Sequence, residues 1–211
     1  MSLLERRIRL EVEQHAPGCR PSLWLARTDG RELLALDADR ILPAASTLKI
    51  LLLVEGFGAE LEGTFRWTDE VTLQDSDRVG GAGTLQLERT GSTWTYQQLA
   101  RRMIAESDNT ASNILLRRLE RAAVNRRAGL LGLPNTHFER DFLDFSARRE
   151  GRENVSTARE MGRLMRMIFR REILSPEACD GMIAILERTS RGRIARGVPK
   201  DIPVGHKAGS L

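Results

Sequence analysis

The sequence has no long apolar run, and its 211 residues include few cysteines, lysines and tyrosines. The longest apolar run, Ile50 to Val54, is far shorter than the roughly 20 residues that span a bilayer, so no membrane span is expected. Residues 1–12 alternate charged residues with Leu and Ile, so no secretory signal is expected either. As it stands, the sequence predicts a cytoplasmic protein, or a periplasmic or secreted one if its N-terminus was trimmed.

The shortage of cysteine narrows the available chemistry. Cys19 and Cys179 are the only two cysteines, and their spacing matches no metal site. We therefore expect neither a metal nor another cofactor. Two unpaired, buried thiols are favoured over one disulfide, because free cysteine is among the most often buried residue types.

The charge pattern argues against nucleic acid as a partner, although the formal net charge is +4. Basic residues occur as doublets among Glu and Asp, a pattern typical of solvated helix faces. With a single tyrosine, few rings are available for base stacking. The 41% apolar and 29% charged residues are those of an ordinary globular protein with one domain or two small lobes. They leave the oligomeric state open.

Lysine is scarce in a different way, because arginine has replaced it almost everywhere. Of the 33 Lys plus Arg, only Lys49, Lys200 and Lys207 are lysines. A guanidinium stays protonated at ordinary pH, whereas a desolvated ammonium can lose its proton and act as a base. These three lysines are therefore candidates for chemistry.

Periodicity and capping residues predict the secondary structure. Residues 5–14 are typical of an amphipathic helix, and Asp29-Gly30 between two apolar runs predicts an antiparallel hairpin over residues 22–36. Cap residues such as Thr95 with Gln98 mark further helix starts. Helices are predicted over residues 46–57, 95–106, 110–122, 157–171 and 175–188, and a last strand over 202–211.

This order predicts an α/β (α+β) fold in which the helices form a block inserted between strands. The sheet lobe is predicted from two separate segments, residues 1–45 and 190–211. Residues 46–189 are predicted to form an all-helical lobe that packs against the sheet lobe.

The first candidate motif is Ser46-Thr47-Leu48-Lys49, at the start of the apolar helix. Residues i and i+3 lie on one helix face, so the Ser46 hydroxyl and the Lys49 amine are expected to meet. The helix start favours negative charge, and burial of Lys49 among apolar neighbours lowers its pKa, so the amine can accept the serine proton. The alternative is an N-cap serine followed by a surface lysine, and the motif alone does not exclude it.

The second motif, Ser107-Asp108-Asn109, lies between two predicted helices. Ser, Asp and Asn are preferred caps, so a purely structural role is an open alternative. Functionally, the Ser107 hydroxyl could relay a proton, and the Asn109 amide could donate to a substrate carbonyl.

The third motif, Lys207-Ala208-Gly209-Ser210, falls on the predicted last strand. Small residues after the lysine would let a substrate backbone lie alongside the strand. The ammonium could hold a substrate carboxylate or polarise Ser107. The alternative is an ordinary strand lysine near a chain end.

Together the motifs form a family signature. S-x-x-K, S-D-N and K-x-G occur in this order, separated by 61 and 100 residues, and this resembles class A β-lactamases and penicillin-binding proteins. Residues 106–116 and 205–211 are also similar to the family's segments around the second and third motifs. The resemblance implies a β-lactamase/transpeptidase-like fold with an antiparallel sheet lobe flanked by helices, a helical lobe, and the active site between them.

The resemblance also implies catalytic roles. Ser46 would attack a strained or activated carbonyl to form an acyl-enzyme, with Lys49 as the base. Ser107 would pass the proton to the leaving nitrogen, with Lys207 tuning it.

Substrate binding is implied in the same way. Asn109 would bind the acyl-side amide, and Lys207, Ala208 and Gly209 would lie beside the substrate. Backbone N–H groups of Ser46 and Ser210 would form the oxyanion hole.

Two departures from the family pattern concern turnover and affinity. If Arg140 matches the family's loop arginine, Phe142 occupies the place of the glutamate that activates water for deacylation, and a phenyl ring cannot accept a proton. Asp141 or Asp144 would be the substitute base, or else a surface or ion-pairing residue. Ala208 replaces the usual Thr or Ser, which should weaken carboxylate binding by ~1 kcal/mol.

A third departure is length, because the family continues past the last motif with further strands and a closing helix that are not in this sequence. The sequence therefore predicts a β-lactamase-like serine hydrolase that acts on small molecules, β-lactams or related amides and esters, with impaired deacylation. Two alternatives are a peptidoglycan D-amino peptidase or esterase of the same fold, and a non-catalytic ligand-binding relative.

Overall fold

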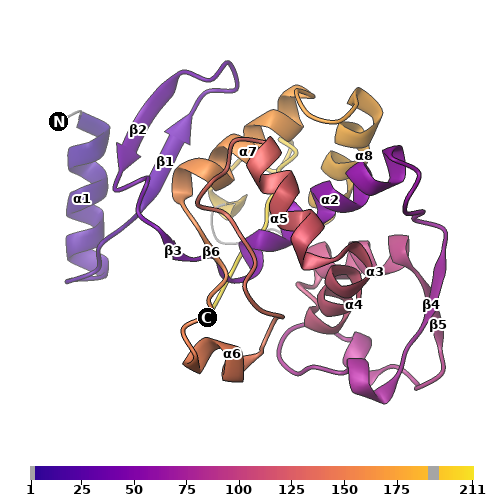
Figure 1. The fold of residues 1–211 in the computed structure, drawn as a ribbon. Coiled ribbons are helices and arrows are strands. Elements are labelled where there is room, and N and C mark those ends of the chain that lie inside the picture. Colours follow the sequence, from indigo (N-terminus) through magenta and orange to yellow (C-terminus); the bar gives the residue numbers. More distant parts are fainter. Residues whose placement is uncertain (1–2, 190–194) are drawn as a thin grey trace.

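The computed structural model describes residues 3–189 and 195–211, so the predicted lobe boundaries at residues 1 and 190 lie outside the described residues. The chain begins with helix α1 (Leu3–His15) and the hairpin of β1 (Leu23–Ala26) and β2 (Glu32–Leu36), which together form one side of the molecule. Most of the remaining helices lie on the other side (Figure 1). The chain therefore has the α+β architecture expected from the sequence.

The hairpin confirms the prediction from Asp29-Gly30. β1 and β2 pair antiparallel, and the Arg31 N–H donates to the Asp29 carboxylate across the turn. Trp24 packs the hairpin onto helix α7 (Ala158–Arg170) at Gly162, where an added Cβ would lie 2.2 Å from the indole ring. The glycine therefore permits the close packing of the hairpin on the helices.

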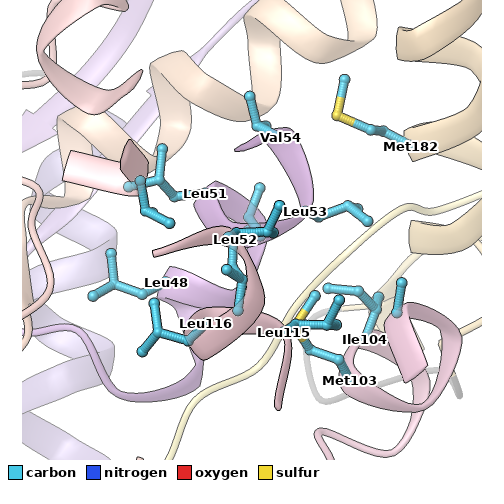
Figure 2. Close-up of a cluster of buried hydrophobic side chains, with 14 of the residues drawn as sticks. Leu48, Leu51, Leu52, Leu53, Val54, Met103, Ile104, Leu115, Leu116 and Met182 are labelled. Atoms are coloured by element: carbon cyan, nitrogen blue, oxygen red, sulfur yellow. The ribbon is translucent and has the colours of Figure 1, made fainter. Parts of the chain in front are cut away.

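Helix α2 (Lys49–Leu61) forms the centre of the core, preceded by a 3-10 turn over Ala45–Leu48. Its residues from Ile50 to Val54 are all buried, as expected for a helix that is apolar on every side. Figure 2 shows α2 side chains packed among Leu115 of α4 (Asn109–Leu119), Ile104 of α3 (Tyr96–Ala105) and Met182 of α8 (Pro176–Leu186). The candidate nucleophile is therefore positioned by a densely packed part of the fold.

The predicted caps start the helices that surround α2. Thr95 and Gln98 form the capping box of α3, and Asp108 caps α4. Thr157 caps α7, and Ser175 caps α8 with Pro176 as its first residue. These caps are local hydrogen bonds between neighbours in sequence, which is why the sequence alone located them.

Other elements depend on distant contacts and were not predicted. β4 (Glu70–Thr72) pairs with β5 (Thr93–Thr95), and β3 (Leu42–Pro43) pairs with β6 (Val155–Ser156). The helix predicted to end at residue 122 instead ends at Leu119, because Glu120 has φ 64°, and α5 (Arg121–Leu130) follows. The short helix α6 (Phe145–Arg149) lies in the loop between α5 and β6.

The prediction of a strand over residues 202–211 is wrong. This segment has no regular secondary structure, since the described part of the chain offers no neighbouring strand for a ladder of backbone hydrogen bonds. The segment instead runs against the start of the 3-10 turn, where a Cβ added to Gly209 would lie 3.2 Å from the Ser46 nitrogen.

The two cysteines are free, as predicted, but only one is buried. Cys179 lies in the core, whereas Cys19 is exposed. The exposure of Cys19 follows from its position just after α1, a helix that buries none of its residues.

Candidate active site

The structure around the start of α2 does not match the alternative in which Ser46 is an N-cap and Lys49 a surface lysine. Ala44 is the N-cap of the 3-10 turn, so Ser46 is not a cap. Ser46 is half-buried and faces a pocket, whereas Lys49 is completely buried at the first position of α2. Lys49 is therefore not a surface lysine.

The Lys49 amine is held by residues of the second motif. Its Nζ donates to the Ser107 carbonyl at 2.5 Å, to Asn109 Oδ1 at 2.8 Å and to Ser107 Oγ at 3.3 Å. The Phe142 ring covers the amine, with 4.6 Å between Nζ and the ring centroid. Burial, together with the nearby charge of Lys207, lowers the pKa of Lys49 to about 7, while Asp108 opposes the shift.

Ser107 connects the two lysines. It has a positive φ of 58° between α3 and α4, a conformation that costs an L-residue free energy. Lys207 Nζ donates to Ser107 Oγ at 2.9 Å. While both lysines are charged, each can donate to this oxygen, and the hydroxyl hydrogen of Ser107 is then free to point toward a bound molecule.

Asp108 anchors this turn rather than taking part in the pocket. Its carboxylate is buried, accepts from the Ala111 N–H as the cap of α4 and also accepts from the Leu85 N–H. An added Cβ on Gly83, which has φ +99°, would lie 2.2 Å from Asp108 Oδ2. The glycine-rich loop over residues 79–83 therefore packs directly on the second motif.

The third motif, in the C-terminal segment, lies beside Ser107 and Ser46. Lys207 is partly buried, and this burial lowers its pKa to about 8. Gly209 passes next to the backbone nitrogen of Ser46, where a side chain would crowd it. This brings the backbone around Ser210 close to the N–H of Ser46.

One pocket of about 450 Å³ contains all three motifs. Its lining includes every predicted catalytic and substrate-binding residue except the buried Lys49: Ser46, Ser107, Asn109, Lys207, Ala208, Gly209 and Ser210. Lys49 lies directly beneath, bonded to Ser107 and Asn109.

The two candidate deacylation bases are not among the pocket residues. Asp141 pairs with Arg121 at 2.7 Å and is half-exposed. Asp144 caps α6 through the Ala147 N–H. The position beside Lys49 is occupied by Phe142, whose backbone is fixed on both sides by the Asn113 side chain.

The sequence analysis missed several pocket residues. Leu143, Phe145 and Arg148 come from the loop before β6, and Gly81 comes from the glycine-rich loop. The three glycines within residues 80–83 were a signal for a close backbone approach, but the other three residues carry no motif.

Comparison with known proteins decides the family. The sequence matches the sequence model of the beta-lactamase enzyme family over residues 3–211. The chain belongs to the beta-lactamase enzyme family. Membership indicates a serine hydrolase or a penicillin-binding relative of one, with small-molecule ligands of the β-lactam type. A comparison with curated protein sequences gave no significant match.

Solved structures of β-lactamases and of PBP-A resemble this protein over most of its length. A β-lactamase from Sphaerobacter thermophilus DSM 20745 is 31% identical, with a TM-score of 0.81, over 87% of this chain and 69% of that one. A mutant of PBP-A, in an acyl-enzyme complex with penicillin G, is 30% identical with a TM-score of 0.82. The match covers 98% of this chain and 77% of that one. An ancestral class A β-lactamase is 26% identical with a TM-score of 0.85, and the match covers 97% of this chain and 79% of that one.

Two searches of the described residues gave negative results. No helix within residues 3–189 and 195–211 is long and apolar enough to cross a membrane. The same residues contain no cluster of three His, Cys, Asp or Glu side chains with the geometry to hold a metal ion.

Proposed function

We propose that this family member forms an acyl-enzyme at Ser46 with β-lactams or related amides and esters, and that it releases the acyl group slowly. The observation that carries the proposal is the hydroxyl of Ser107 between two lysine amines, Lys49 at 3.3 Å and Lys207 at 2.9 Å, in the pocket that Ser46 lines.

In the proposed acylation, these groups act in turn. With a pKa near 7, Lys49 is substantially neutral at physiological pH and takes the Ser46 proton as Oγ attacks the carbonyl carbon. The N–H groups of Ser46 and Ser210 stabilise the oxyanion. As the C–N bond breaks, Ser107 gives its hydroxyl proton to the leaving nitrogen and is reprotonated from the neighbouring lysines, which leaves an ester on Ser46.

Slow deacylation is supported by what surrounds the ester. Hydrolysis needs a general base that deprotonates a water beside the acyl carbonyl, and in the resembling family this base is a glutamate. Glu106 is the one carboxylate side chain among the described pocket residues, and it accepts hydrogen bonds from the N–H and hydroxyl of Thr84. Phe142 fills the space over Lys49 with carbon and offers no acceptor.

The similar PBP-A mutant, captured with penicillin G as an acyl-enzyme, supports penicillin as the first probe. Incubation with benzylpenicillin is expected to add the mass of one penicillin to the protein, which intact-mass spectrometry measures. Ser46→Ala should abolish the adduct, and a matched change at an exposed serine outside the pocket, Ser146→Ala, should leave it unchanged. An absent adduct, or one that survives Ser46→Ala, contradicts the proposal.

A second pair of variants tests deacylation. Phe142→Glu is expected to shorten the lifetime of the penicillin adduct, because it places a carboxylate over the buried amine. Phe142→Ala removes the ring without supplying a base and should not shorten the lifetime to the same extent. Adduct decay after removal of free penicillin, together with nitrocefin turnover, measures both. Equal lifetimes in all three proteins would show that residue 142 does not limit deacylation.

Ala208 favours a second candidate function, a D-amino peptidase or esterase acting through the same serine. A methyl group at this position supplies no hydroxyl for a substrate carboxylate. Hydrolysis of p-nitrophenyl esters or D-Ala-D-Ala peptides without lactam turnover would select this function. A Lys49 pKa near 10.5 by NMR, with none of these activities, would favour a non-catalytic ligand-binding relative.

A further inference from the structure

The wall of the pocket formed by α6 takes no part in the acylation chemistry, yet its side chains are prominent. Phe145 is 54% exposed although it is a large apolar residue, and Arg148 lies one turn further along α6. Both line the pocket that contains Ser46. Figure 1 shows α6 beside the C-terminal segment that carries Lys207.

This wall lies on the acyl side of the site. A Cβ added to Gly81 would lie 2.9 Å from Asn109 Nδ2 and 3.1 Å from Leu143 Cδ1, so the loop before α6 and the Asn109 amide meet at the same glycine. The leaving group is placed instead by Ser107 and Lys207. A substrate whose acyl amide contacts Asn109 therefore extends its acyl side chain toward Leu143 and α6.

Arg148 shares its counter-ion with a second arginine. Its Nε lies 3.1 Å from Glu153 Oε2, while the other oxygen of Glu153 accepts from the buried Arg140 at 2.6 Å. One carboxylate thus serves two guanidinium groups. The Nη groups of Arg148 have no hydrogen-bond partner among the described residues, and its side chain is 42% exposed.

We propose that Arg148 is a specificity-determining residue that binds an anionic group on the acyl side chain of the substrate, beside an apolar surface formed by Leu143 and Phe145. This inference rests on the proposed acyl-enzyme function. With its Nε beside Glu153, the guanidinium leaves its two terminal nitrogens available in the geometry that a carboxylate accepts. The preferred substrates therefore carry a carboxylate on an aromatic or aliphatic acyl group.

The test compares benzylpenicillin with carbenicillin, which differ by one carboxylate on the carbon next to the acyl carbonyl. Acylation rates are measured by intact-mass spectrometry at substrate concentrations below saturation. The wild-type protein is expected to react about three to ten times faster with carbenicillin, the range of a charge-assisted pair that is partly exposed. Added salt should reduce this preference, because it screens an exposed charge.

Arg148→Gln should remove the preference, because the carbenicillin rate falls to the level of the benzylpenicillin rate in the same variant. Arg149→Gln, an exposed neighbour outside the pocket lining, should keep the preference. Arg148→Lys keeps the positive charge but lacks the paired terminal nitrogens of a guanidinium, so it should retain part of the preference. Thermal unfolding of each variant verifies that it folds.

Equal rates with the two penicillins in the wild type, or a preference that survives Arg148→Gln, would overturn the role of Arg148 but not the acyl-enzyme. Failure of both penicillins to acylate the wild type would overturn the proposed function, and this inference with it.

Discussion

Lys49 is completely buried, and its amine is bonded to Ser107 and Asn109 under the ring of Phe142. A buried ammonium with no carboxylate bonded to it is costly, so the protein favours the neutral amine as the pH rises. Lys207 shares this environment in part, and its positive charge disfavours a second charge on Lys49. The two amines therefore lose their protons near pH 7 and pH 8, well below the pKa of an ordinary lysine.

The first prediction is a bell-shaped pH dependence of acylation. The base must be neutral, so the rate should rise as the pH increases through about 7, the pKa of Lys49. Lys207 must stay charged to polarise Ser107, so the rate should fall above about 8. Benzylpenicillin acylation rates across this range provide the measurement. Lys207→Arg should remove the alkaline decline, and a rate that falls between about pH 6 and pH 7.5 would contradict the assignment of Lys49 as base.

The second prediction concerns the backbone of Ser107, which has φ 58°. Ser107→Gly and Ser107→Ala both lose the hydroxyl and should both acylate slowly. Only glycine adopts this conformation without cost, so Ser107→Gly should be about 1 kcal/mol more stable than Ser107→Ala. Urea denaturation of the two variants measures the difference, and equal stabilities would contradict the argument.

Between elements, one ion-pair network connects α5 with the helix that carries the candidate base. Arg127 Nε donates to Glu55 Oε2 at 2.8 Å, and Nη2 donates to Glu62 Oε1 at 2.5 Å. Glu55 is 4% exposed, and Gly58 leaves room for the guanidinium, since an added Cβ would lie 2.5 Å from its Nη2. The Arg127–Glu55 pair is therefore packed into the interface, whereas Glu62 lies at its exposed edge.

The third prediction follows from the burial of Glu55. Arg127→Met leaves a carboxylate buried without its partner and should cost ~3 kcal/mol of unfolding free energy. The double variant Glu55→Met with Arg127→Met removes both charges and should cost clearly less. Chemical denaturation of both proteins is the measurement, and a double variant that is less stable than Arg127→Met would contradict the prediction.

Considered as a whole, the molecule has one thiol on its surface and one in its core. Cys19 is exposed, whereas Cys179 is buried, donates to the Ile173 carbonyl and has a raised pKa, chiefly because of burial. The fourth prediction is therefore that a thiol reagent such as Ellman's reagent titrates one group in the native protein and two after unfolding. Cys19→Ser should reduce the native value to zero, and rapid reaction of two native thiols would contradict the fold around α8.

Local hydrogen bonds made some parts of the fold predictable from the sequence, and distant contacts did not. The helix starts at Thr95, Thr157 and Ser175 were predictable because each cap bonds to a residue three positions later. The absence of a strand over residues 202–211 was not predictable, because the local pattern of a segment says nothing about whether a partner strand is present. Within the site, the second and third motifs do contact Lys49 or each other through Ser107, whereas the predicted meeting of Ser46 with Lys49 stays a prediction. Nothing near Phe142 in the sequence indicates that its ring covers Lys49.

The scarcity of lysine has a practical consequence for chemical labelling. Amine-reactive esters attack neutral amines, and the arginine-rich surface offers them almost nothing. Two of the three lysines, Lys49 and Lys207, have lowered pKa values, and both belong to the pocket. Near neutral pH, a small acylating reagent should therefore modify this protein preferentially at Lys207, which lines the pocket mouth, and a bound substrate should shield it.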